Sequence, residues 1–194
     1  MADAAFPKEA SVKTACVLLA NGCEEIEAIT PIDYLRRAGV KVTSAGIGGR
    51  DILGGRGIPL GADAVLDDID DEDFDCVIVP GGGKGSDAIA ADEMARAFIK
   101  RHAARGSVIA SICAAPAVVL GKACGLLAGK RFTCFPGLET QVPEGIFSSG
   151  RVVVDGNLVT SRAAGCAGEF AVAVARILVG DDAARKLAET VLLA

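Results

Sequence analysis

The sequence has no tryptophan, one tyrosine and a single histidine, His102, among 194 residues. A metal site or a Cys-His-Asp/Glu triad would therefore have to use His102, which we predict to be a surface residue near the end of a helix at 92–105. Seven cysteines are present without a CxxC pair, and their number is odd. This pattern is typical of reduced thiols and of neither a disulfide framework nor a metal centre, so we expect no metal.

The chain also lacks a stripe of basic residues, although it carries both charges and a net charge of -5. Without such a stripe nucleic acid is not expected as the primary partner. The first residues lack the basic-then-apolar order of a secretory signal, which favours a cytoplasmic location. The most apolar stretch, 108–127, is interrupted by Pro116 and Lys122, so we expect no membrane span. No Pro/Ser-rich linker divides the chain, and we predict a tail at 1–12 and one domain at 13–194.

Strands and helices alternate along the sequence. A buried strand at 15–20, an amphipathic helix at 24–38 and a strand at 40–46 form a first βαβ unit. Later segments repeat the alternation. A strand from 75 runs into a glycine-rich turn at 80–83, and the helix at 92–105, a strand at 107–112 and a helix after Cys113 follow. A hairpin at 151–161, a helix at 169–179 and a last short helix capped by Asp181 or Asp182 complete the chain. Short edge strands are expected between 47 and 71. This order predicts an α/β fold with a doubly wound, mostly parallel sheet and helices on both faces.

Sheets of this kind hold their sites at the carboxyl ends of the strands. Three loops lie at such ends, at 20–27, 80–86 and 113–116. We therefore expect these loops to converge in space and to form the functional site.

Cys113 follows an apolar strand directly and opens a helix. A sulfur at such a sharp turn lies near the positive end of a helix, which stabilises a thiolate. The alternative is an inert buried cysteine, because free cysteine is among the most buried residue types. Cys113 is the candidate nucleophile.

The acidic cluster Glu24, Glu25 and Glu27 lies in the first of these loops. One of these carboxyl groups is the expected partner of the thiol, and the spacing alone does not choose among them. The others would compensate the helix N-terminus. A carboxyl group beside a thiolate would share a proton with it and titrate as a coupled system.

Backbone amides can complete such a site. The turn at 81–83, together with the amide of Ala114, is a candidate oxyanion hole. The alternative is that the glycine run is only a tight turn.

The motifs LLANGCEEIEAITPIDYLRRAGVKVT, VIVPGGGKGS, ASICAAP and LVTSR together resemble the ThiJ/PfpI superfamily, in its branch of DJ-one-type deglycases and YajL, over nearly the whole chain. The resemblance implies a flavodoxin-like fold, related to class I glutamine amidotransferases, and a homodimer. It implies that Cys113 is the reactive cysteine and Glu27 its protonated partner, with Gly82 and Ala114 as amide donors. It also implies that Arg56 contacts substrate or the oxidised cysteine, reaching the partner's site.

Two features depart from the family pattern. Phe135 stands where some members have a histidine, and Ala163-Ala164 replaces a glycine-proline pair. Glu27 would then have to carry all proton transfers.

Three functions follow as hypotheses. The leading one is a cofactor-independent enzyme, a glyoxalase or deglycase, that acts on small reactive dicarbonyls or glycated proteins. A redox sensor in which Cys113 is oxidised is the alternative, and a holdase chaperone is the third.

Overall fold

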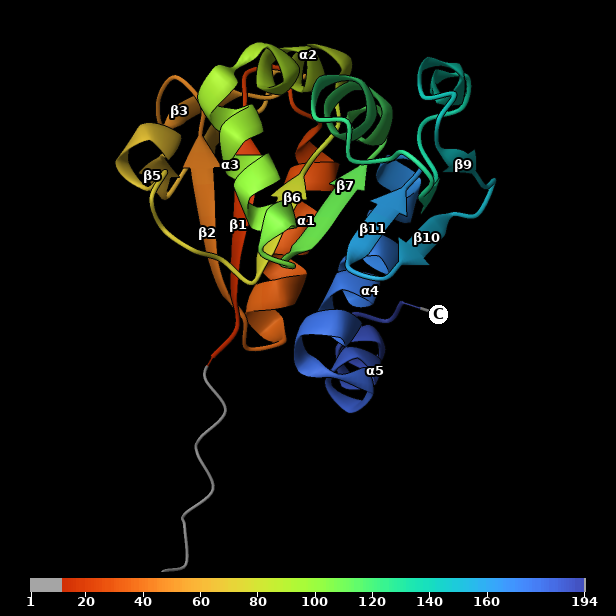
Figure 1. The fold of residues 1–194 in the computed structure, drawn as a ribbon. Coiled ribbons are helices and arrows are strands. Elements are labelled where there is room, and N and C mark those ends of the chain that lie inside the picture. Colours follow the sequence, from red (N-terminus) through yellow and green to blue (C-terminus); the bar gives the residue numbers. More distant parts are fainter. Residues whose placement is uncertain (1–11, 194) are drawn as a thin grey trace, which may run out of the picture.

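The computed structural model describes residues 12–193, so of the predicted tail only Val12 is described. Its centre is a seven-stranded sheet in the order β10-β11-β7-β6-β1-β2-β5 (Figure 1). The strands are β1 (Thr14–Leu19), β2 (Lys41–Gly46), β5 (Ala64–Val65), β6 (Cys76–Val79), β7 (Val108–Ile112), β10 (Val152–Asp155) and β11 (Leu158–Ser161). All neighbours are parallel except β10 and β11, which form the predicted antiparallel hairpin. The prediction of a mostly parallel, doubly wound sheet is confirmed.

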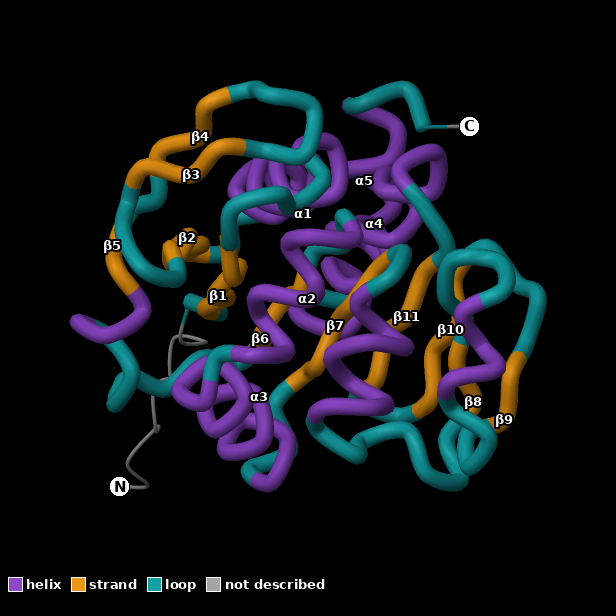
Figure 2. The backbone as a smooth tube through the Cα atoms, turned by 90° about the horizontal axis from the view of Figure 1, so that it is seen from above, coloured by secondary structure: helices purple, strands orange, loops and turns teal. Residues whose placement is uncertain are grey.

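Helices cover both faces of the sheet, as the view from above shows (Figure 2). One face carries α1 (Glu25–Arg37), α4 (Ala167–Val179) and α5 (Asp181–Thr190). The other carries α2 (Gly83–Ala91), α3 (Glu93–Ala104) and a π-helix at Pro116–Ala123. Alternate residues of β1 serve the two cores: Val17 packs with the first group and Leu18 with the second. Both faces of the sheet are therefore buried.

Short elements decorate this framework. Two small sheets join β3 (Asp51–Leu53) to β4 (Pro59–Gly61) and β8 (Arg131–Phe132) to β9 (Ile146–Phe147), and short 3-10 helices lie at Leu66–Asp68, Leu138–Gln141 and Ala164–Cys166. The predicted short strands between 47 and 71 are thus present. Only β5 joins the edge of the main sheet.

The first helix illustrates how local signals set its ends. The side chain of Glu24 accepts a hydrogen bond from the Glu27 amide, 2.8 Å, and so caps the N-terminus of α1. Arg36 and Arg37 lie in its last turn, where cations are favoured. Gly39 follows with a φ of +83°, a conformation that glycine adopts without strain.

Two local predictions were wrong. A helix, α2, begins at Gly83, where we expected only a turn, because packing against the π-helix offsets the low helix propensity of its glycines. The last helix, α5, is preceded by Gly180, and neither Asp181 nor Asp182 caps it, since both lie inside its first turn. No helix within residues 12–193 is both long and apolar enough to cross a membrane.

Candidate active site

The three predicted loops do converge. The amide of Glu24, in the first loop, donates to the carbonyl of Gly81 in the second, 3.0 Å. A Cβ on Gly82 would lie 2.4 Å from the carbonyl oxygen of Gly22, and a Cβ on Gly81 would lie 2.5 Å from the Cβ of Cys113. The carboxyl ends of β1, β6 and β7 therefore meet, and glycine is needed at 81 and 82 for the loops to approach.

Cys113 occupies a sharp turn between β7 and the π-helix. Its φ is +65°, in the left-handed region that non-glycine residues seldom adopt. Two backbone hydrogen bonds hold it there: its amide donates to the carbonyl of Ser161, 2.9 Å, and its carbonyl accepts from the amide of Phe135, 2.7 Å. This is the geometry of a nucleophile elbow, in which the side chain is directed away from the sheet.

Glu27 lies against the same turn. Its side chain is fully buried, and its Oε2 accepts a hydrogen bond from the amide of Gly81, 3.0 Å. A Cβ on Gly81 would come within 2.4 Å of that oxygen. The other oxygen, Oε1, is buried and has no hydrogen-bond partner among the described residues. A buried, half-satisfied carboxylate is unfavourable, so protonation of this group is favoured.

Burial raises the pKa of Glu27 from 4.5 to about 7, and the charge of Glu24 adds to the effect. The thiol of Cys113 and the amides of Gly81 and Ala164 act in the opposite direction. The carboxyl group is therefore poised to hold or release a proton near neutral pH.

Burial also raises the pKa of the Cys113 thiol to about 12, and the negative charge of an ionised Glu27 is the second cause. The amides of Gly82 and Ala114 lower it. Because protonation of Glu27 removes the opposing charge, the pKa of the thiol is lower when Glu27 is neutral than when it is ionised. The two groups therefore compete for one proton.

The other two acids of the cluster have structural tasks. Glu24 caps α1, as described above. Glu25 is 4% exposed, and its Oε1 accepts from the amides of Arg56, 2.7 Å, and Ile58, 3.4 Å. Glu25 thus holds the loop between β3 and β4, and only Glu27 reaches the cysteine. The sequence left this choice open.

Arg56 lies in that loop and is exposed. Together with Gly22, Glu24, Gly82 and Lys84 it lines a hollow of about 300 Å³. Since Gly82 directly follows Gly81, which lies against Cys113, the hollow adjoins the elbow. Arg56 is therefore near the site within one chain. Lys84 was not singled out from the sequence, where the only signal was a cation directly after the glycine run.

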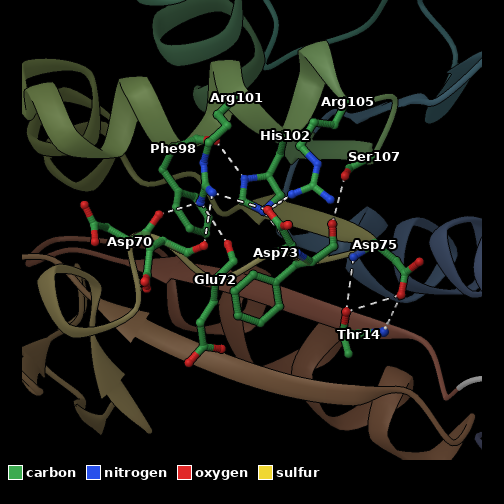
Figure 3. A network of polar contacts seen from close by, with 12 residues as sticks. Thr14, Asp70, Glu72, Asp73, Asp75, Phe98, Arg101, His102, Arg105 and Ser107 are labelled. Carbon is green, nitrogen blue, oxygen red and sulfur yellow. Dashed lines mark hydrogen bonds and ion pairs between the residues drawn. The ribbon is translucent and has the colours of Figure 1, made fainter.

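The prediction that His102 is a surface residue was wrong. Its side chain is fully buried; Nδ1 lies 2.8 Å from the carbonyl of Phe98, and Nε2 accepts from the amide of Phe74, 3.1 Å (Figure 3). Figure 3 shows the ring directed from α3 toward the segment before β6. Burial lowers the pKa of His102. Because both nitrogens serve this packing, His102 does not complete a triad with Cys113.

The two departures from the family pattern both lie beside the site. The amide of Phe135 donates a hydrogen bond to the carbonyl of Cys113, and the Phe135 side chain is 46% exposed. The amide of Ala164 lowers the pKa of Glu27, as described above, and a proline at this position would have no amide hydrogen. Within residues 12–193 no cluster of His, Cys, Asp and Glu is arranged to hold a metal ion.

Comparison with known proteins identifies close relatives. Residues 13–177 match the DJ-1/PfpI family. The chain is 38% identical over 185 residues to Protein dj-1beta of Drosophila melanogaster, covering 94% of this chain and 98% of that protein. It is 32% identical to the glutathione-independent glyoxalase DJR-1.2 of Caenorhabditis elegans, covering 95% and 99%.

A solved structure agrees with this assignment. A cysteine-to-alanine mutant of a DJ-1 superfamily protein from Salmonella typhimurium superposes with a TM-score of 0.91 at 39% identity, covering 94% of this chain and all of that one. The flavodoxin-like fold expected from the resemblance is thus confirmed, and the chain belongs to the DJ-1/PfpI family.

Proposed function

We propose that this protein converts small α-oxoaldehydes such as methylglyoxal to α-hydroxy acids without a cofactor, with Cys113 as nucleophile and Glu27 as acid and base. The observation that carries the proposal is the contact of both side chains with Gly81, which brings a buried carboxyl group of pKa about 7 to the elbow thiol. A relative bears the name glutathione-independent glyoxalase.

The first step uses the thiol of Cys113, whose proton passes to the carboxylate of Glu27. As the sulfur adds to the aldehyde carbon, the oxygen of the resulting hemithioacetal accepts that proton from Glu27. While that oxygen is negative, the amides of Gly82 and Ala114 stabilise it.

The second step uses the carboxylate of Glu27. It removes the hydrogen of the former aldehyde carbon as a proton, the electron pair moves to the neighbouring carbonyl, and Glu27 returns the proton to that second carbon. The hydroxyl proton of the first carbon passes to the oxygen of the second. The aldehyde carbon is oxidised and its neighbour reduced, which leaves an α-hydroxy thioester on Cys113. Water then cleaves the bond between sulfur and carbon and releases the hydroxy acid and the thiol. No external oxidant or reductant is consumed.

The proposal is tested by adding methylglyoxal to the purified protein in metal-free, thiol-free buffer and measuring lactate with an enantiomer-specific assay. We expect lactate from the wild type and none from Cys113→Ser. Consumption of methylglyoxal without lactate would instead favour adduct hydrolysis, the deglycase reaction. If the wild type consumes no methylglyoxal, the proposed enzymatic function is refuted.

A second function, redox sensing, is favoured by a separate observation. Of the seven cysteines, six are buried and Cys113 alone is partly exposed. Its sulfur also faces two amide donors, which would stabilise a sulfinate. We expect limiting peroxide to oxidise Cys113 before the others, as measured by peptide mass spectrometry. Equal oxidation of all seven would exclude this function.

A further inference from the structure

We infer that the hollow beside the elbow is a cationic subsite, and that Lys84, with Arg56, makes the site prefer aldehydes carrying a carboxylate or phosphate. This inference rests on the proposed function and extends it to a class of substrate. Lys84 is a specificity-determining residue in this account and takes no part in proton transfer.

Position is the first argument. Lys84 and Arg56 come from different elements, the first turn of α2 and the loop between β3 and β4, yet they line the same hollow of about 300 Å³. Gly22 makes this possible, because a Cβ at position 22 would lie 2.6 Å from the Cβ of Lys84. The hollow includes Gly82, which directly follows Gly81, and a Cβ on Gly81 would lie 2.5 Å from the Cβ of Cys113. A bound aldehyde would thus have its distal part in the hollow.

The charges around the hollow also favour an anion. None of the ion pairs formed within residues 12–193 includes Lys84 or Arg56. The one carboxyl group that lines the hollow belongs to Glu24, and its Oε2 is engaged with the amide of Glu27. A second carboxylate, that of Glu25, lies behind the loop of Arg56 and interacts with the Arg56 charge. Lys84 is therefore the cation at this hollow without a carboxylate of its own, and it favours an anion.

The test compares two alkylating agents of similar shape, the anion iodoacetate and neutral iodoacetamide, in their rates of reaction with Cys113 measured by peptide mass spectrometry. In Lys84→Met we expect the ratio of iodoacetate to iodoacetamide rate to fall by about two- to fivefold, the range that an exposed pair of opposite charges supports. Lys84→Arg should restore the ratio, and high salt should lower the wild-type ratio toward that of Lys84→Met. Because Lys84 is exposed, its replacement leaves the core intact.

Lys41→Met is the matched control, since it removes the same charge from an exposed position at the opposite end of the sheet. An unchanged ratio in Lys84→Met, or an equal fall in Lys41→Met, would overturn the inference. This test needs no turnover, so it remains decisive even if the protein forms no lactate.

Two substrates then distinguish the anionic groups. Methylglyoxal is compared with dioxovalerate, which ends in a carboxylate, and with hydroxypyruvaldehyde phosphate. We expect Lys84→Met to raise the KM of at least one anionic substrate by about two- to fivefold relative to that of methylglyoxal, with the effect in KM and not in kcat. The substrate whose KM rises more shows whether the hollow prefers a carboxylate or a phosphate. Equal changes for all three substrates would contradict the inference.

Discussion

Glu27 and Cys113 lie against the same glycine. A Cβ on Gly81 would come within 2.4 Å of the Glu27 Oε2 and 2.5 Å of the Cys113 Cβ. The Gly81 amide also donates to that oxygen, so one residue without a side chain both admits the carboxyl group and orients it. This arrangement makes the glycine run part of the site and more than a tight turn.

Gly81→Ala should therefore destabilise the protein and impair the site. We expect a loss of about 1–3 kcal/mol in the free energy of unfolding, as for overpacked cores, together with slower alkylation of Cys113. Denaturant unfolding and iodoacetamide kinetics measure the two effects.

Gly83→Ala is the control for this prediction, since a Cβ at 83 meets nothing within 4 Å and the residue begins α2. It should be neutral or stabilise by up to about 1 kcal/mol through helix propensity. If both variants lose stability equally, the close contact at Gly81 is not the cause.

Stability should depend on pH through Glu27. Its pKa is raised from 4.5 to about 7 in the folded protein, so folding favours the protonated form. The wild type therefore loses stability as pH rises from 4.5 toward 7, by up to about 3 kcal/mol, and the loss persists above that range. Glu27→Gln cannot ionise and should lack this component. Unfolding curves of both proteins across this range measure the difference, and parallel pH profiles would contradict the raised pKa.

His102 should act in the opposite direction. Burial lowers its pKa below 6.5 in the folded protein, so the neutral ring is favoured and stability falls as pH drops through 6.5. Protonation would place a proton on Nε2, which accepts from the Phe74 amide (Figure 3).

The chain has a single histidine, so its ring signal in a proton NMR titration is unambiguous. We expect a midpoint below 6.5 in the native protein and near 6.5 in urea. A native midpoint at or above 6.5 would show that the ring is accessible and charged.

Much of the framework followed from the sequence because its signals are local. The apolar run of β1, the cap and charges of α1 and the elbow position of Cys113 are each encoded within a few residues. The convergence of three loops followed from the rule for parallel sheets.

The errors concern contacts distant in the sequence. His102 looked like a helix-end residue, because nothing near it in the chain reveals that Phe74 covers it. The choice among Glu24, Glu25 and Glu27, which the spacing left open, also depended on a distant contact, since the loop of Arg56 engages Glu25. No pattern within 20–27 contains this information.

In the proposed reaction Glu27 transfers the proton for the chemistry of Cys113. The most direct measurement is the rate of lactate formation from methylglyoxal by Glu27→Gln, with Glu93→Gln as control, because Glu93 is an exposed acid in the first turn of α3. We expect kcat to fall by about 10²- to 10⁴-fold in Glu27→Gln, with the fold retained as judged by circular dichroism, and to be unchanged in Glu93→Gln. Wild-type turnover in folded Glu27→Gln would contradict it.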